Sequence, residues 1–201
     1  MSLFSLLAIS RERCLAFISC LEELEQVSYS DQILLFKRNL DNVEMLAYAF
    51  AFNCGSVEAE IQFALGEKDM VQWKEREKHV TGANLSSVVS FMPISEEDKF
   101  SLYTNLMRCT MAPMKDLSTY VLLVLIVAFD GAPEGSVAAK LRTNFQTMLA
   151  RYLSQKKNGG NVQGELASLY ECCSVLPLLA KPFQGIKYAF EYLKSNPHIP
   201  C

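Results

Sequence analysis

The chain has 201 residues, and half of them are hydrophobic, which is enough for a single domain over residues 1–201 with a sizeable buried core. Its formal net charge of −3 gives no electrostatic reason to expect direct binding to nucleic acid. The seven cysteines contain no C-x-x-C pair, so the spacing of a zinc finger is absent, and their odd number indicates reduced thiols in an intracellular protein.

The first two predicted helices span residues 2–27 and 31–53. In the first, apolar side chains recur at steps of three and four residues, which places them on one helical face. These side chains are Cys14, Leu15, Phe17, Ile18, Leu21 and Leu24. The second helix is predicted to begin at Asp31, whose carboxylate can accept from unpaired backbone amides, with Ser30 as the alternative N-cap.

The segment between residues 53 and 94 has a different pattern, in which residues 61–65 and 70–73 predict a small β-hairpin. Helices are predicted again over residues 95–112, 116–129, 135–155 and 163–194. Ser95 and Asp98 are a predicted capping box at the start of the first of these. The longest apolar run, residues 120–129, is about half as long as a membrane span requires, so it predicts a buried helix. We therefore expect an all-α fold without a membrane segment.

No arrangement of residues indicates catalysis. His79 and His198 lie far apart in the sequence and near no cluster of cysteines or acids, so neither a metal site nor a Cys-His dyad is indicated. The chain contains no G-x-S-x-G, P-loop or G-x-G-x-x-G motif. We expect a protein that is not an enzyme and that uses no cofactor and no metal.

One stretch of the N-terminal half resembles a known family. Phe17, Leu21 and Leu24 are followed, after a gap, by the string Asp31-Gln32-Ile33-x-Leu35-x-Lys37. This pattern is similar to the signature of the nuclear receptor ligand-binding domain at the junction of its third and fourth helices. The string is fairly specific, and it sets the register for the rest of the comparison.

Three later segments resemble the same family in the same order. Residues 117–129, 140–153 and 175–193 are similar to its eighth, ninth and tenth/eleventh helices. The resemblance implies a three-layer antiparallel helical sandwich with a small β-hairpin. It also implies a nuclear ligand-binding and dimerisation module that regulates transcription. The alternative is an unrelated all-α protein-interaction domain, with an α-helical enzyme as a third interpretation.

The chain departs from the family pattern at several positions. Ser19 stands where the family carries a lysine that caps a coactivator helix, whereas Lys37, the second groove lysine, is retained. Thr119 and Ser168 replace a glutamate and an arginine of the family. We also expect the family's first helix, its C-terminal activation helix and its DNA-binding domain to be missing from this chain.

The resemblance implies a ligand pocket between the first two predicted helices. Its expected lining is Leu3, Leu7, Ser10, Cys14, Met45 and Tyr48. Apolar side chains dominate this set, as in most small-molecule sites. The position of the ligand-anchoring arginine of acid-binding receptors is Ala51, or Asn53 in a shifted register. We therefore expect an apolar ligand or a cavity filled by side chains.

The resemblance also implies a coregulator groove, lined by Leu15, Ser19, Gln32, Ile33, Phe36 and Lys37. Such an apolar trough suits a Leu-x-x-Leu-Leu helix. Because Ser19 supplies no charge and the activation helix is absent, the expected partner is a corepressor rather than a coactivator. Lys37 could equally be a solvated lysine without a binding role.

A dimer surface is expected on the last helix, which is rich in apolar and aromatic residues. The expected residues are Leu178, Leu179, Phe183, Ile186, Phe190 and Leu193. Exposed patches of this kind usually mark interfaces, and the family's homo- and heterodimer contacts lie on the same helix. The competing interpretation is a surface that is merely left uncovered by the missing first helix.

Overall fold

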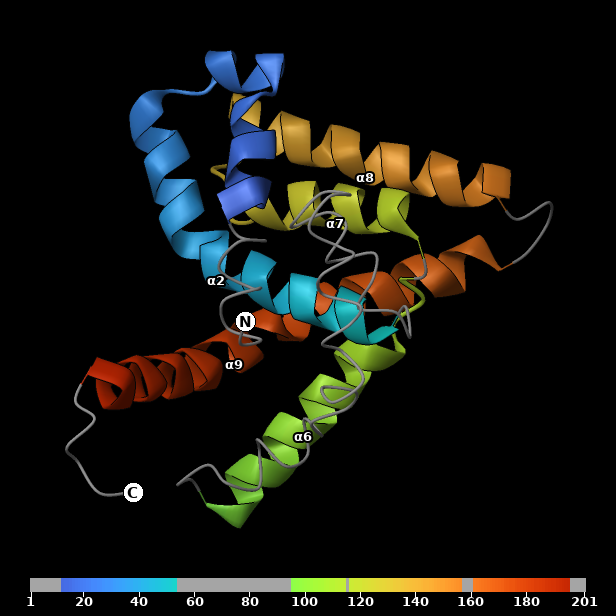
Figure 1. Cartoon of the computed structure of the whole chain (residues 1–201). Coiled ribbons are helices and arrows are strands. Elements are labelled where there is room, and N and C mark those ends of the chain that lie inside the picture. Colours follow the sequence, from blue (N-terminus) through green and yellow to red (C-terminus); the bar gives the residue numbers. More distant parts are fainter. Residues whose placement is uncertain (1–11, 54–94, 115, 157–160, 196–201) are drawn as a thin grey trace, which may run out of the picture.

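In the computed structural model, the described residues are 12–53, 95–114, 116–156 and 161–195, and their regular secondary structure is entirely helical (Figure 1). Within these ranges, side chains are not described at positions 48, 51–53, 103, 106–107, 110–111, 183 and 185–195. The elements are a helix over residues 12–19, the 3₁₀ segment η1 (Glu22–Gln26), α2 (Tyr29–Asn53), α6 (Glu96–Met111), α7 (Leu117–Ala128), α8 (Val137–Lys156) and α9 (Val162–Ser195). The all-α prediction is confirmed for this part of the chain, and the predicted hairpin lies outside it.

The helices predicted at 95–112, 116–129, 135–155 and 163–194 are confirmed to within two residues at each end. The predicted capping box is also present, because Ser95 Oγ accepts a hydrogen bond of 3.1 Å from the backbone amide of Asp98. α9 runs as one helix through Pro177 and Pro182. None of the helices in the described ranges is long and apolar enough to cross a bilayer.

The prediction of one helix over residues 2–27 is wrong in its second half. The helix ends at residue 19, and Leu21 has an extended backbone, with φ −74° and ψ 119°. The chain then turns through η1, and Leu24 in this segment and Val27 directly after it are buried. Gln32 Nε2 donates to the carbonyl oxygens of Leu24 and Val27 at 3.0 and 2.8 Å. These carbonyls are thus satisfied without a continuing α-helix.

The N-cap of α2 is Ser28, so the prediction of Asp31 or Ser30 at this position is wrong. Ser28 Oγ accepts from the amide of Asp31 at 3.2 Å and donates to Asp31 Oδ2 at 2.6 Å. Asp31 therefore occupies the third helical position, where its negative charge also interacts favourably with the helix dipole. The family-like string Asp31-Gln32 lies inside the first turn of α2 instead of joining two helices.

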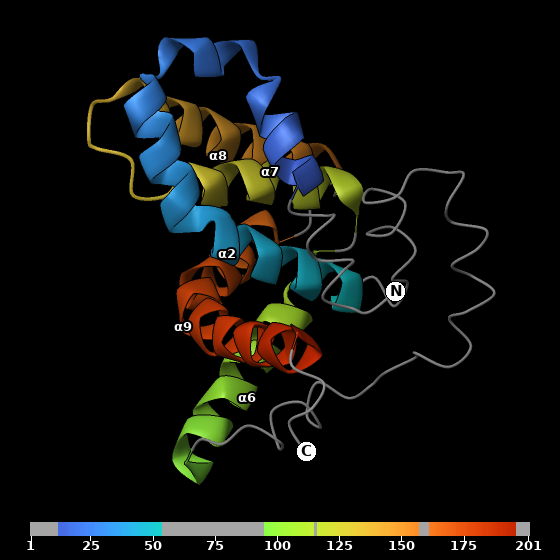
Figure 2. The ribbon, with the colours of Figure 1, turned by 60° about the vertical axis from the view of Figure 1, so that its left-hand side comes forward.

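α7 lies between α8 and α2, and α9 and α6 lie on the other side of α2 (Figures 1 and 2). Every residue from 123 to 129 is buried, which confirms the buried helix expected from the apolar run. Phe50 of α2 stacks on Tyr120 of α7 with 4.3 Å between ring centroids. On the opposite side of α7, the ring of Phe129 packs 5.9 Å from that of Phe145 in α8.

The C-terminal end of α7 is held by a buried amide side chain of α2. Asn39 is 1% exposed, and its Nδ2 donates to the carbonyl oxygens of Ala128 and Asp130 at 3.1 and 2.8 Å. Carbonyls at a helix end have no partner within the helix, and burying them unpaired is unfavourable. Asn39 therefore ties the middle of α2 to the end of α7.

We predict that Asn39→Ala lowers the free energy of unfolding by about 2 kcal/mol, because it leaves two carbonyl groups without their donor in a buried site. Urea denaturation followed by circular dichroism measures this change. The matched control is Asn144→Ala on the exposed face of α8, which should stay within about 0.5 kcal/mol of the unchanged protein. Equal effects of the two substitutions would contradict the role assigned to Asn39.

Candidate interaction groove and polar network

An open pocket of about 420 Å³ lies along the N-terminal half of α2. Its floor is formed by α2 residues spaced three and four apart, which lie on one face of the helix. These residues are Ile33, Phe36, Lys37 and Leu40, with Asp41 beside them. Leu15 of the preceding helix and Gln184 of α9 line the pocket as well. We call this pocket the α2 groove.

The α2 groove combines an apolar floor with charged side chains. Ile33 is 39% exposed, while Leu15, Phe36 and Leu40 are partly buried. Lys37 and Asp41 lie one helical turn apart, so the lining of the groove contains one residue of each charge. Its lining therefore mixes apolar and polar surface, and an amphipathic helix is a partner that presents both kinds of surface.

Four of the six residues predicted for a coregulator groove line the α2 groove. They are Leu15, Ile33, Phe36 and Lys37. The other two, Ser19 and Gln32, are not among its lining residues. Ser19 Oγ donates to the carbonyl oxygen of Ala16 at 2.7 Å, and Gln32 bonds to the η1 segment, so both have local structural contacts.

The sequence interpretation missed Leu40, Asp41 and Gln184. Leu40 continues the helical spacing that starts at Ile33, so extending the pattern by one turn would have found it. The same spacing predicts Asp41, which is the fourth residue after Lys37. Gln184 has no such pattern, because its place in the groove depends on where α9 crosses α2.

The residues predicted for a ligand pocket are only partly described. Cys14 and Met45 are buried, and Cys14 Sγ lies 3.8 Å from the Tyr120 hydroxyl. Leu3, Leu7 and Ser10, together with the side chain of Tyr48, lie outside the described residues. The expected ligand pocket therefore stays a prediction, with two of its members placed in the core.

The predicted dimer surface is also described in part. Leu178 is 59% exposed. A residue that forms a dimer interface is expected to be exposed in the isolated monomer. Leu179 is fully buried, so its place on the surface is corrected: successive residues of a helix point about 100° apart, and Leu179 faces the core. The side chains of Phe183, Ile186, Phe190 and Leu193 lie outside the description.

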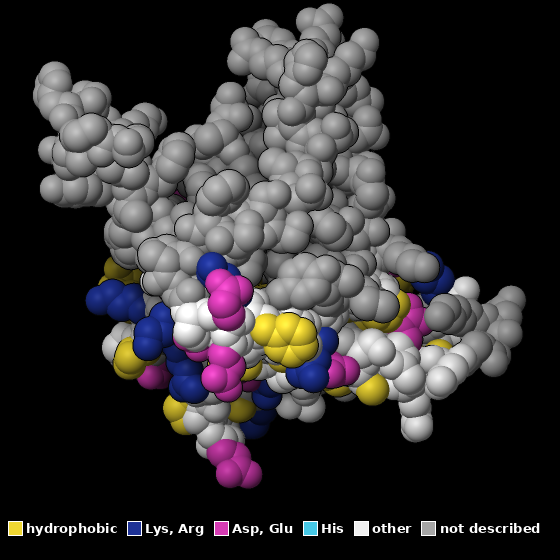
Figure 3. Space-filling view, turned by 90° about the horizontal axis from the view of Figure 1, so that it is seen from below, with side chains coloured by type: hydrophobic (Ala, Val, Ile, Leu, Met, Phe, Trp, Pro, Cys, Tyr) yellow, Lys and Arg dark blue, Asp and Glu magenta, His cyan; other side chains and the backbone are white. Residues whose placement is uncertain are grey.

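The underside of the molecule, in the orientation of Figure 1, carries charges of both signs. Figure 3 shows Lys and Arg side chains intermixed with Asp and Glu, and with separate hydrophobic side chains between them. On the described part of this face, no large area of one sign stands out. A partner that approaches here meets a mixed charge pattern.

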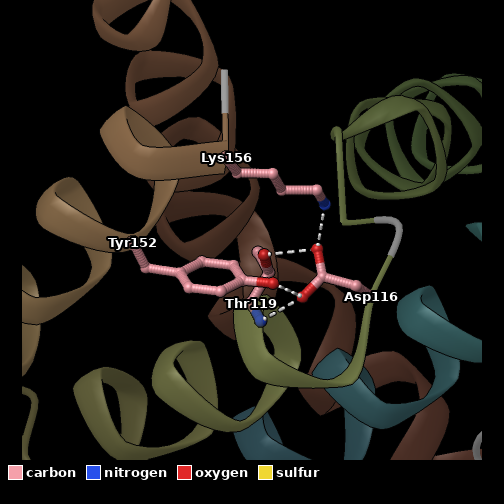
Figure 4. A network of polar contacts seen from close by, with 4 residues as sticks. All are labelled: Asp116, Thr119, Tyr152 and Lys156. Carbon is pink, nitrogen blue, oxygen red and sulfur yellow. Dashed lines mark hydrogen bonds and ion pairs between the residues drawn. The ribbon is translucent and has the colours of Figure 1, made fainter. Parts of the chain in front are cut away.

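A polar network joins the start of α7 to the end of α8 (Figure 4). Asp116 is the N-cap of α7: its Oδ1 accepts from the amide of Thr119 at 2.9 Å and from the Tyr152 hydroxyl at 3.0 Å. Its Oδ2 accepts from the Thr119 hydroxyl at 2.9 Å and from Lys156 Nζ at 2.6 Å. Both oxygens of the carboxylate therefore have two donors each.

The contacts of Asp116 favour its charged form. Burial raises the pKa of this carboxyl, but the hydrogen bonds from Lys156, from the backbone and hydroxyl of Thr119 and from Tyr152 outweigh that effect, and the pKa lies below its ordinary value of 3.8. The hydrogen bond to Asp116 in turn raises the pKa of Lys156 above 10.5. This satisfied network is a structural link between two helices.

Thr119 and Ser168 stand where the resemblance predicts a glutamate and an arginine, and both side chains are described. Thr119 is fully buried and donates to Asp116. Ser168 is exposed, and its hydroxyl donates to the carbonyl oxygen of Gly164 at 3.1 Å. An uncharged residue at Thr119 leaves no unpaired ionised group in the interior, where it would be costly.

In the part of the chain that the structure describes, no group of three or more His, Cys, Asp and Glu side chains is arranged to hold a metal ion. Comparisons of the chain with protein-family models, with curated proteins and with solved structures found no match.

We predict that Asp116→Asn lowers the free energy of unfolding by up to about 1 kcal/mol near pH 7. Asparagine still caps the helix, whereas the pair with Lys156 is lost, and this pair is worth little because the lysine side chain is 42% exposed. Urea unfolding measures the difference, and Lys140→Gln on the exposed face of α8 serves as the control.

The difference in the free energy of unfolding between the unchanged protein and Asp116→Asn should depend on pH. A carboxyl with a lowered pKa stabilises the fold above its ordinary value of 3.8, and this contribution disappears as the pH falls through the folded-state pKa. The raised pKa of Lys156 contributes below 10.5, and that contribution disappears as the pH rises through the folded value. A difference that stays constant from pH 2 to pH 7 would contradict the assigned network.

Proposed function

We propose that this chain is a nuclear-receptor-like module that binds ligands and partner proteins in the nucleus and takes part in transcriptional regulation. The observation that carries the proposal is the α2 groove. Leu15, Ile33, Phe36 and Lys37 line one pocket, and the resemblance assigns these same residues to a coregulator groove.

The helix arrangement gives further support. The apolar helix α7 lies between α2 and α8, and the elements after residue 95 follow the order expected from the resemblance. A buried helix enclosed by helices on two sides is what the central layer of a three-layer sandwich requires. We propose that the fold is such an antiparallel sandwich, with a β-hairpin in the segment between α2 and α6.

The partner at the α2 groove is proposed to be a coregulator helix of the corepressor kind. Lys37 can interact favourably with the C-terminal end of a bound helix, where backbone carbonyls carry partial negative charge. Ser19 supplies no second charge, since its hydroxyl bonds to the adjacent turn. Binding therefore depends mainly on apolar contacts with Ile33, Phe36 and Leu40, and coactivator helices are expected to bind weakly.

The proposed ligand is an apolar small molecule in a cavity near Cys14 and Met45. Both of these residues are buried. Ala51 and Asn53 stand at the candidate positions of the family's ligand-anchoring arginine, and neither can pair with a carboxylate. The proposal therefore excludes an acid held by an arginine as the ligand.

An all-α interaction domain outside the nuclear receptor family is the second candidate. It is favoured by the groove itself, because an apolar face flanked by Lys37 and Asp41 can take an amphipathic helix of many proteins. The two candidates differ in the bound sequence. A nuclear-receptor-like module prefers coregulator motifs to unrelated amphipathic helices, whereas a different interaction domain has no such preference.

We predict that a labelled corepressor helix binds the chain and that Ile33→Asp weakens this binding by about tenfold or more, because a carboxylate replaces an apolar contact. Leu34→Asp is the matched control, since Leu34 is 67% exposed and does not line the groove. Fluorescence anisotropy measures both affinities. A scrambled amphipathic peptide that binds as tightly as the corepressor helix would favour the second candidate.

A coactivator Leu-x-x-Leu-Leu peptide provides the contrasting measurement. Helix-end charges contribute roughly 0.3–1 kcal/mol each, so the absence of a charge at Ser19 should leave its binding weak or undetectable. Low-micromolar affinity that is lost on Lys37→Ala would show instead that one lysine is sufficient, and it would overturn the preference for corepressors.

We also propose a dimer, of two copies or with another receptor, formed mainly through the C-terminal half of α9. Leu178→Glu should shift the chain towards the monomer, because it places a charge in the apolar contact. Met148→Glu is the control, since Met148 is 51% exposed on α8, away from the proposed surface. Sedimentation gives the oligomeric state, and native mass spectrometry adds any bound apolar ligand. A monomer at tens of micromolar, or a dimer unaffected by Leu178→Glu, would exclude a homodimer through this surface.

A further inference from the structure

The C-terminal end of α6 meets the N-terminal half of α9 (Figure 1), and two cysteines face each other across this contact. Cys109 Sγ donates to the carbonyl oxygen of Cys172 at 3.6 Å, and Cys172 Sγ donates to the carbonyl oxygen of Cys109 at 4.0 Å. Each sulfur therefore lies beside the backbone of the other residue. Both side chains are fully buried.

The two side chains therefore lie in the same small region of the contact between α6 and α9. A hydrogen bond with the Cys109 thiol, together with burial, raises the pKa of the Cys172 thiol. A disulfide requires an S–S distance of about 2 Å. Side chains that each reach the other residue's carbonyl oxygen can come to this distance by rotation and a local approach of the two helices. All five cysteines with described side chains are at present unbridged thiols.

We propose that Cys109 and Cys172 are a modification site at which a low-molecular-weight disulfide oxidises the pair and covalently joins α6 to α9. One cysteine thiolate attacks the oxidant and releases one equivalent of its thiolate, which leaves a mixed disulfide. The second cysteine thiolate then attacks the protein sulfur and releases the second equivalent. The pair loses two protons and two electrons, and the oxidant is reduced to two thiols.

Cys173 is adjacent in the sequence but is not the bridging residue. Successive residues of a helix point about 100° apart, and Cys173 lies close enough to Asp130 and Arg142 for their charges to influence its thiol. Burial raises the pKa of Cys173 as well. The side chain that faces α6 is that of Cys172.

The same burial makes the reaction slow in the closed fold. A thiolate is the attacking species, and a buried thiol with a raised pKa provides very little of it. Reaction therefore requires α6 to separate locally from α9. The exposed thiol of Cys20 needs no such opening, so it reacts first. Its complete modification shows that the oxidant has had time to react with an accessible thiol. Once formed, the bridge closes a loop between residues 63 positions apart and restricts the unfolded chain.

The test is to incubate the full chain with glutathione disulfide, with and without a low urea concentration that favours local opening. Remaining thiols are blocked, and unreduced tryptic peptides are analysed by mass spectrometry. No trypsin site lies between Cys172 and Cys173, so the Cys173→Ser variant assigns the bridge. We expect a Cys109–Cys172 linkage in this variant, formed faster in urea, and a melting temperature raised by on the order of 5 °C or more.

The control is Cys172→Ser, in which the linkage and the shift in melting temperature should both be absent. If this variant does not fold, the assignment rests on the mapped peptides of the Cys173→Ser chain alone. The proposal is overturned if no Cys109–Cys172 linkage forms after Cys20 is completely modified in low urea, or if Cys109 is joined to Cys173 instead.

Discussion

The structure depends on the burial of α7 with the polar groups at both of its ends satisfied. Its apolar side chains pack against α2 on one side and α8 on the other. Burial of so hydrophobic a helix is favourable only if its terminal amides and carbonyls keep partners. Asp116 accepts from the first turn, and Asn39 of α2 donates to the last carbonyls. The residues that enclose α7 therefore also fix the relative positions of α2 and α8.

The α2 groove exists because the two halves of α2 are buried to different extents. From Val43 to Ala47 every residue is buried. In the first half, Leu35 and Asn39 face the core, while Ile33 and Lys37 are exposed. The first half of α2 therefore keeps apolar side chains that its neighbours cover only in part. These side chains form the floor of the groove.

Polar contacts in this fold link elements that are far apart in the sequence. Asp116 and Lys156 connect the start of α7 to the end of α8, and Cys109 and Cys172 connect α6 to α9. The first contact is partly solvated, so its charge pair contributes modestly. The second is fully buried, and each of its two thiols contacts the carbonyl oxygen of the other cysteine. A solvated ion pair responds to pH, whereas a buried thiol pair responds to oxidation and only after local opening.

The sequence by itself determined the four helices after residue 95 and the burial of the 120–129 run, because helical periodicity and apolar composition are local properties. Four of the residues that line the α2 groove were expected only from the resemblance to a family. The sequence could not determine that the first helix stops at residue 19, because the bonds of Gln32 to Leu24 and Val27 are made by a neighbouring helix. Nor could it place Gln184 in the groove, Leu179 in the core, or Cys109 beside Cys172. These features depend on how helices cross, and a helix of given periodicity can pack in several orientations until its neighbours select one.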